Sequence, residues 1–162
     1  MPLLKQLYEC VYVPDAVWKE LVTPLTEVWA EIPEDISEIL NAYSGKWLVP
    51  KRVEEKYRRL SRELIMYGIH ESQADAIALA KQLKADFFLT NDETARKVAV
   101  KHKVRTRWLT EVLLDALKVG LIRRPQNFDE TLDKLVSKGL WIRKTLVQNA
   151  KNKAREISLV KG

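Results

Sequence analysis

The sequence is poor in the residues that form disulfides and thiolate metal sites. Cys10 is the single cysteine among 162 residues, so the chain has no internal disulfide and no cysteine cluster for zinc. His70 and His102 are the two histidines, and because they lack the spacing of metal ligands we interpret both as structural. Such sparing use of cysteine is typical of a reducing, intracellular compartment, so we expect a cytoplasmic location.

Long apolar runs and repeats are also missing. No secretory apolar segment opens the chain and no run of about 18 apolar residues is present, so we expect no association with a membrane. The apolar content is nevertheless 46%, which is enough for a packed core. A length of 162 residues then predicts about one globular domain.

The charge balance permits a polyanionic partner without requiring one. The 28 basic residues exceed the 22 acidic residues, which gives a net charge of +6. Basic side chains gather in three segments, each of which is either a nucleic-acid contact or a solvated helical face. The three groups are Lys51, Arg52, Lys56, Arg58, Arg59 and Arg62; Lys101, Lys103, Arg105 and Arg107; and Arg143, Lys144, Lys151, Lys153 and Arg155. Beside the second group, Trp108 is either a stacking platform for a base or a core residue.

Short apolar runs alternate with segments of helical periodicity, which indicates an α/β fold with a parallel sheet. The predicted strands are 9–14, 46–50, 86–90 and a short one near 103–108. The predicted helices are 15–23, 35–44, 51–66, 71–83, 93–102 and 109–119, with a bend between Pro24 and Pro33 and two further helices separated at Gly139. The helix 71–83 is apolar around most of its circumference, so we expect it to be central and buried. Gly120 is expected to follow the end of the helix 109–119.

Three acidic residues occupy positions where this framework would bury them. Asp92 follows the third apolar run, and it either caps the next helix or lies at the carboxyl edge of a sheet, where open α/β sheets bind ligands. Asp75 is either the partner of Ser72 in a capping box or a buried metal ligand. Glu20 lies on the helical face expected to point inward, with a surface salt bridge as the alternative. Because buried carboxylates are costly unless paired or bound to a cation, convergence on a metal ion would account for all three.

Three stretches resemble successive motifs of the PIN-domain family. They are "VYVPDAVWKEL" (11–21), "ESQADAIALAKQLKADFFLTNDETARKVA" (71–99) and "LTEVLLDALKVGLI" (109–122). The similarity is to the archaeal and bacterial branch of nucleic-acid-binding PIN-domain proteins, a branch that resembles the VapC-type toxins of toxin–antitoxin pairs. It extends from Tyr8 to about Ala154, and the middle stretch is its most specific part.

The resemblance implies a three-layer α/β/α sandwich around a five-stranded parallel sheet in the order 3-2-1-4-5. It also implies an active site in which four acidic residues at the carboxyl edge hold Mg²⁺ or Mn²⁺. Glu20, Asp75 and Asp92 fall on three of these acids, and Thr90 and Asn91 match the polar residues that accompany the last one. The fold is expected to occupy residues 1–122, with 123–162 forming a C-terminal helical extension that packs on it.

The chain departs from the family pattern at its first strand. That strand normally reads apolar-apolar-Asp-Ser/Thr-Ser and supplies the fourth acid, whereas this chain begins with "MPLLKQLYEC", which resembles the helix that follows it. Without the strand, its two neighbours would expose unpaired backbone groups. We expect that another segment or a second chain fills the slot, for example in a homodimer formed by strand exchange, or that the true start of translation lies upstream.

The activity implied by the resemblance is metal-dependent hydrolysis of RNA phosphodiester bonds, with an antitoxin protein as partner if the protein is a toxin. Asp75 and Asp92 would hold the metal, and Glu20 would bind a second ion or orient water. Thr90 or Asn91 would position water or phosphate, and RNA would be bound by Lys101, Lys103, Arg105, Arg107 and Trp108. Since one acid is missing, we expect weak metal binding and doubtful activity. The alternatives are a degenerate PIN-like module that binds RNA or a protein without cutting, and a structural domain whose acids are caps.

Overall fold

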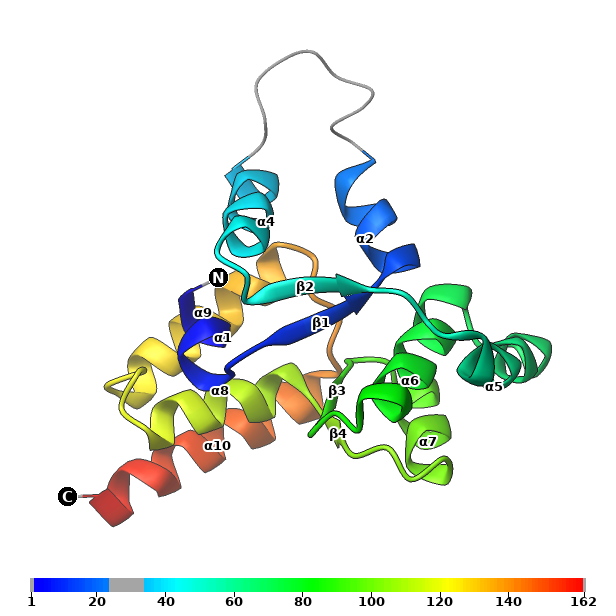
Figure 1. Ribbon diagram of the computed structural model, residues 1–162. Coiled ribbons are helices and arrows are strands. Elements are labelled where there is room, and N and C mark those ends of the chain that lie inside the picture. Colours follow the sequence, from blue (N-terminus) through cyan, green and yellow to red (C-terminus); the bar gives the residue numbers. More distant parts are fainter. Residues whose placement is uncertain (1, 24–33, 162) are drawn as a thin grey trace. The chain divides into compact units, whose positions relative to one another are not determined.

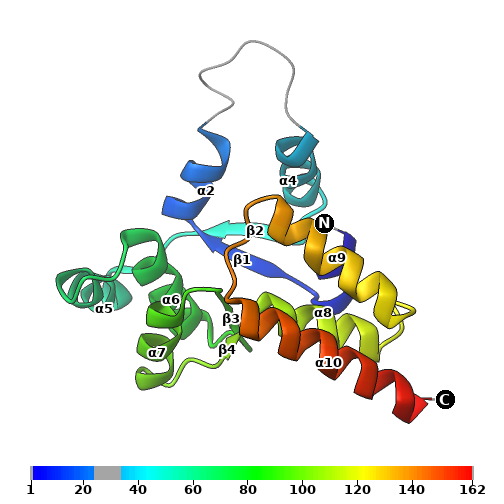
Figure 2. The ribbon, with the colours of Figure 1, turned by 180° about the vertical axis from the view of Figure 1, so that it is seen from behind.

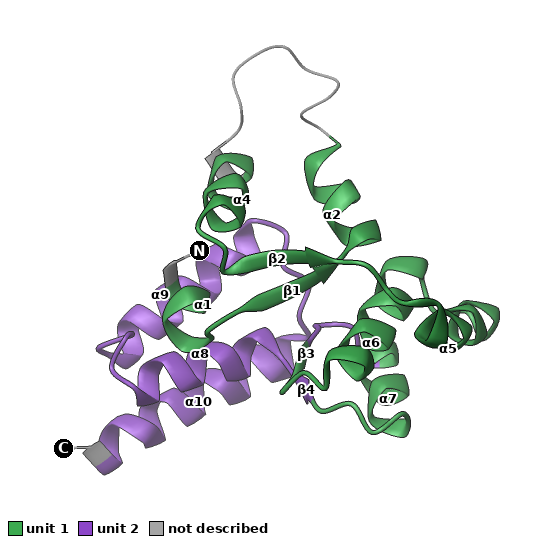
Figure 3. Cartoon of the chain, viewed as in Figure 1, with its two compact units in different colours: residues 1–88, 94–105 green, residues 89–93, 106–162 purple. Residues whose placement is uncertain are grey.

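The computed structural model describes residues 2–23 and 34–161. The chain divides into two compact units, which are coloured separately in Figure 3. Unit 1 comprises Met1–Phe88 and Thr94–Arg105, and unit 2 comprises Leu89–Glu93 and Thr106–Gly162. The short segment that carries Asp92 therefore belongs to unit 2 together with the C-terminal helices.

The described residues are mostly helical, with four short strands (Figure 1). The helices are α1 (Pro2–Leu7), α2 (Asp15–Val22), α4 (Glu34–Ser44), α5 (Glu55–Met66), α6 (Glu71–Leu83), α7 (Glu93–Lys101), α8 (Leu109–Lys118), α9 (Pro125–Ser137) and α10 (Lys144–Lys161). The strands are β1 (Val11–Pro14), β2 (Leu48–Lys51), β3 (Phe88–Leu89) and β4 (Thr106–Arg107). These elements confirm the predicted order of strands and helices and the α/β class. The bend expected within 24–33 lies outside the described residues.

The strands β1 and β2 form a parallel pair in unit 1, with Val11 opposite Leu48. The Val11 amide donates to the Trp47 carbonyl at 2.7 Å. Both strands consist mainly of apolar residues, of which Pro14 and Leu48 are buried, whereas Tyr12 and Lys51 are exposed. Side chains from β1 and β2 and from the adjoining helices form one apolar cluster, which contains Leu4, Val11, Val13, Trp18, Ile39, Ala42, Trp47 and Leu48.

The strands β3 and β4 form a second pair. The Phe88 amide donates to the Arg105 carbonyl at 2.8 Å, and the Thr90 amide donates to the Arg107 carbonyl at 3.1 Å. Both partners advance by two residues in the same direction, so this pair is also parallel. Among the described residues, β1 pairs only with β2 and β3 only with β4.

The helix α6 is the central buried element of unit 1, as its sequence predicts. Its bounds are those expected, and six of its side chains are buried: Ala74, Asp75, Ile77, Ala78, Leu79 and Ala80. The small alanines allow close packing, and α6 packs against its neighbour α5 (Figure 1). The helix α5 is charged on its outer face and buries only Ser61 and Leu64. One polar side chain of α5 is thus directed into the packed α5–α6 contact.

Unit 2 is built around three helices that pack against one another, α8, α9 and α10 (Figure 2). Phe128 and Leu132 of α9 are fully buried, and Val112 of α8 is too. Gly120 follows the end of α8 with φ of 83°, a left-handed conformation that glycine adopts without steric cost, as predicted. The described residues include no helix that is long and apolar enough to cross a membrane.

Candidate functional site

The carboxylate of Asp75 is buried on α6. Its side chain is 7% exposed, and it is the only ionisable side chain that is buried among the described residues. The Ser61 hydroxyl of α5, itself 4% exposed, donates a hydrogen bond to Asp75 Oδ1 at 2.5 Å. That is the length expected for a hydroxyl that donates to a carboxylate. No lysine, arginine or histidine among the described residues forms an ion pair with Asp75.

The capping-box interpretation of Asp75 is wrong. The helix α6 begins at Glu71 with His70 in the N-cap position, so Ser72 lies inside the first turn and cannot be the N-cap. The Ser72 hydroxyl instead lies 2.7 Å from Nδ1 of His70. Asp75 is therefore a buried acid whose bonding partner comes from another helix, and the local sequence does not explain its presence.

Glu20 lies in the last turns of α2, and its side chain is exposed. The prediction that its helical face points inward is wrong, because α2 has no buried residue at all. The apolar neighbours of Glu20 are only half-buried, so this helix packs less deeply than α6. Glu20 is available to water and to a ligand.

The segment 90–93 is held by a series of polar contacts within unit 2. The Thr90 hydroxyl oxygen accepts a hydrogen bond from the Asp92 amide at 3.1 Å. The Asn91 side-chain oxygen accepts one from the Leu109 amide at 3.0 Å, so Asn91 caps the first turn of α8 rather than the helix that follows it in sequence. Asp92 is exposed and directly precedes α7, the N-cap position that the sequence predicts. Thr90 and Asn91 thus shape the loop that presents Asp92.

The C-terminal helices contribute one more contact to this segment. Arg143, just before α10, forms an ion pair with Glu93, which adjoins Asp92. The Trp108 amide donates to the Glu111 carboxylate at 2.8 Å and so completes the start of α8. Sequence reasoning missed the contacts of Ser61 and Arg143, because their partners lie 14 and 50 residues away along the chain.

These observations describe an α/β chain with parallel strand pairs, a buried acid on its central helix and an exposed acid after its third strand. The family model described as PIN domain matches residues 1–156. The chain belongs to the PIN-domain family. No curated protein and no solved structure matches the chain. The family is one of nuclease-type domains that bind divalent metal ions and nucleic acids, and the predicted PIN-like α/β fold is confirmed.

The carboxylate oxygens of Glu20, Asp75 and Asp92 are ligands of the kind that hard divalent cations prefer. Asp75 fits such a role best, because a buried carboxylate without a basic partner is costly until a cation neutralises it. Glu20 and Asp75 belong to unit 1 and Asp92 to unit 2, so all three come together within neither unit. In the part of the chain that the structure describes, no three His, Cys, Asp or Glu side chains are grouped closely enough to hold a metal ion.

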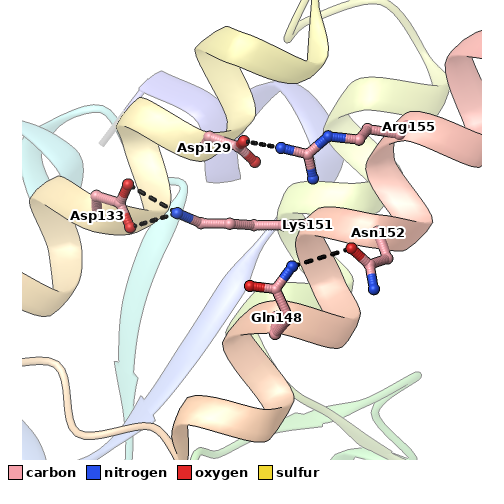
Figure 4. Close-up of polar contacts among 6 residues, drawn as sticks. All are labelled: Asp129, Asp133, Gln148, Lys151, Asn152 and Arg155. Carbon is pink, nitrogen blue, oxygen red and sulfur yellow. Dashed lines mark hydrogen bonds and ion pairs between the residues drawn. The ribbon is translucent and has the colours of Figure 1, made fainter.

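About half of the residues in the three basic groups of the PIN domain form ion pairs. The members of these groups with a carboxylate partner are Arg59 with Glu63, Arg62 with Glu55, Arg105 with Asp86, Arg107 with Asp115, Arg143 with Glu93, Lys151 with Asp133 and Arg155 with Asp129. Figure 4 shows the last two, which join α9 to α10. Lys101 and Lys103 are exposed, and Trp108 is half-buried at the start of α8. The pairing favours a solvated, structural role for Arg59 and Arg62 of the first group and for most of the third group.

Proposed function

We propose that this PIN domain is a metal-dependent ribonuclease that hydrolyses phosphodiester bonds of RNA. The observation that carries the proposal is the buried carboxylate of Asp75, whose only hydrogen-bond partner among the described residues is an uncharged hydroxyl. A structural carboxylate at such a depth normally faces a basic side chain. Asp75 has no basic partner among the described residues, which leaves its charge available to a metal ion. The chain belongs to a family of nuclease-type domains, which supports this role.

The proposed ligands are Asp75, Asp92 and Glu20, and the proposed ion is Mg²⁺ or Mn²⁺. When bound, such an ion lowers the pKa of a coordinated water and neutralises charge on the phosphoryl oxygens. Asp75 would hold the ion from the packed side. Asp92 would offer an exposed carboxylate from a loop that Thr90 and Asn91 shape. Glu20, exposed on α2, would bind a second ion or orient water.

The substrate side of the proposal rests on the second basic group. Lys101 and Lys103 are exposed at the end of α7 and just beyond it, where they can attract a phosphate backbone. Arg105 and Arg107 follow them in the chain, although each also has a carboxylate partner. Trp108 follows directly, and we propose that its ring supports a base. We further propose that the substrate is RNA and that an antitoxin protein is a partner. We also propose that the protein forms a homodimer by strand exchange and is located in the cytoplasm.

Labelled single-stranded RNA tests the proposal directly. The purified protein should cut the RNA in the presence of Mg²⁺ or Mn²⁺ and stop when EDTA is added. Asp92→Asn should lower the rate by about 10²-fold or more, since one charged ligand is exchanged for a neutral group of the same shape. Cleavage that persists in EDTA, or that is equally fast in Asp92→Asn, would contradict a metal-dependent mechanism at these residues.

One observation favours a second function, a catalytically degenerate PIN-like module that binds nucleic acid or protein without cutting. Among the described residues no three metal-ligating side chains are grouped together. The same RNA assay separates the two functions. A protein that shifts the mobility of RNA on a native gel, yet leaves it intact with either ion, would support the binding module over the nuclease.

A further inference from the structure

The pair formed by Ser61 and Asp75 is the most deeply buried polar contact between side chains among the described residues. The two groups lie on different helices, 14 residues apart in sequence, and both are more than nine-tenths buried. The apolar side chains Leu64 and Ile77 of the same two helices belong to one core cluster. The contact is therefore enclosed on the side where α5 meets α6.

A serine inside a helix usually directs its hydroxyl to water or back to a carbonyl of its own helix. The Ser61 hydroxyl instead crosses to Asp75. It carries a single proton, so it can donate to one carboxylate oxygen at a time, and the oxygen it contacts is Oδ1. This bond fixes the rotation of the carboxylate and leaves Oδ2 without a bond to Ser61.

We propose that Ser61 is a positioning residue that holds the Asp75 carboxylate in the orientation required for a divalent cation. The inference rests on the proposed function, because it assigns Ser61 a role toward the same ion. Side chains that hydrogen-bond to a metal ligand keep that ligand oriented and tune its affinity. Removing such a partner typically weakens metal binding about 10–100-fold.

The position of Ser61 in its helix fits this role better than a general structural one. The helix α5 is otherwise charged, and an alanine at residue 61 would favour the helix and fill an apolar contact without a buried hydroxyl. The hydroxyl contributes one thing that alanine cannot, a proton aimed at Asp75. The Ser61 hydroxyl should therefore contribute more to the affinity for the metal ion than to the stability of the fold.

The test is Mn²⁺ binding to the full-length protein, measured by isothermal titration calorimetry. Ser61→Ala should raise the Kd for Mn²⁺ about 10–100-fold, while its Tm in EDTA falls by about 5 °C or less. Ser61→Thr, which keeps the hydroxyl, should bind within a few-fold of the original protein. Ser61→Cys is slightly larger and offers a weaker donor, so its Kd should lie between those of the alanine and threonine variants, and it serves if the alanine variant does not fold.

Two controls make the outcomes distinguishable. Ser72→Ala removes a hydroxyl of α6 that contacts His70 and not Asp75, and it should leave the Kd unchanged. In Asp75→Asn the further change of Ser61 to Ala should have no additional effect on Mn²⁺ binding. If Asp75→Asn loses Mn²⁺ binding but Ser61→Ala binds normally, the positioning role is overturned and the proposed function stands. If Asp75→Asn binds Mn²⁺ as tightly as the original protein, or the original protein binds none, both are overturned.

Discussion

The acidic residues of two helix pairs differ in the groups that they contact. Between α9 and α10, Asp133 faces Lys151 at 2.7 Å and Asp129 faces Arg155 at 2.7 Å (Figure 4). Between α5 and α6, the Asp75 carboxylate accepts a hydrogen bond from the Ser61 hydroxyl. Asp133 is 60% exposed and needs little compensation, yet it has a cationic partner, whereas Asp75 is 7% exposed and has none among the residues that the structure describes.

Under the proposed function, the contrast separates acids that stabilise the fold from an acid that binds a metal ion. An ion pair on the surface of a helical hairpin is an ordinary structural feature of modest strength. A buried carboxylate without a cation lowers stability unless something outside the chain compensates for it. In a chain of the PIN-domain family, a divalent ion is the natural candidate for that compensation.

Truncation of the two cores should have the largest effect on stability and should show whether the units unfold separately. Ile77→Ala in unit 1 and Leu132→Ala in unit 2 each remove a fully buried side chain, so each should lower the free energy of unfolding by about 2–5 kcal/mol. Hydrogen exchange should locate the loss of protection in the unit that carries the substitution. Equal loss throughout the chain would show that the two units unfold as one. Val136→Ala, at a side chain 40% exposed, is the control and should cost far less.

Neutralising an acid should lower activity when the acid lies between α5 and α6, but not when it lies between α9 and α10. Asp75→Asn should lower RNA cleavage about 10²–10³-fold, because it removes the charge of a proposed ligand while keeping the acceptor for Ser61. Asp133→Asn should leave the rate within about two-fold, because Asp133 only pairs with Lys151. Without metal, Asp75→Asn should be at least as stable as the original protein, as measured by urea unfolding in EDTA. Equal rate losses in the two variants would remove the distinction between the pairs.

The ion pair between Asp133 and Lys151 should make a small but measurable contribution. A double-mutant cycle with Asp133→Ala and Lys151→Ala should give a coupling free energy of about 0.5–1 kcal/mol, since Lys151 is largely buried and Asp133 is not. Chemical denaturation supplies the four free energies. A coupling of several kcal/mol would mean that this hairpin, too, contains a strongly desolvated charge.

The pair between Arg143 and Glu93 should have the smallest effect on stability. Both side chains are more than a third exposed, so Arg143→Ala should cost a few tenths of a kcal/mol, and the cost should fall as salt is raised. Its proximity to Asp92 makes a second readout informative, because a looser 90–93 segment should exchange its amide hydrogens faster. Unchanged exchange there would show that Thr90 and Asn91 hold the segment without help from α10.

Much of the fold could be predicted because local signals agree with it. The helix 71–83 has its predicted bounds, since the apolar pattern stops at Leu83 and Lys84 adopts a left-handed conformation that ends the helix. Gly120 marked the end of α8 for the same kind of reason. The helix predicted at 51–66 begins only at Glu55, because Lys51 still belongs to β2.

The contacts of the candidate site could be predicted less well. Asp75 was recognised as an acid in an apolar helix, but its partner depends on which side of α5 packs against α6. Asn91 was assigned by resemblance to water or phosphate, and its contact with Leu109 arises only once β3 and β4 are paired. Glu20 was expected to point inward because its neighbours are apolar, and α2 buries too little for that pattern to hold.

The most direct test of the central claim is a Mn²⁺ titration followed by electron paramagnetic resonance on three proteins: the original chain, Asp75→Asn and Asp133→Asn. The account predicts that the original chain and Asp133→Asn bind the ion with the same affinity and that Asp75→Asn binds it at least about 10-fold more weakly. Equal affinity in all three proteins, or no binding in any, would contradict it.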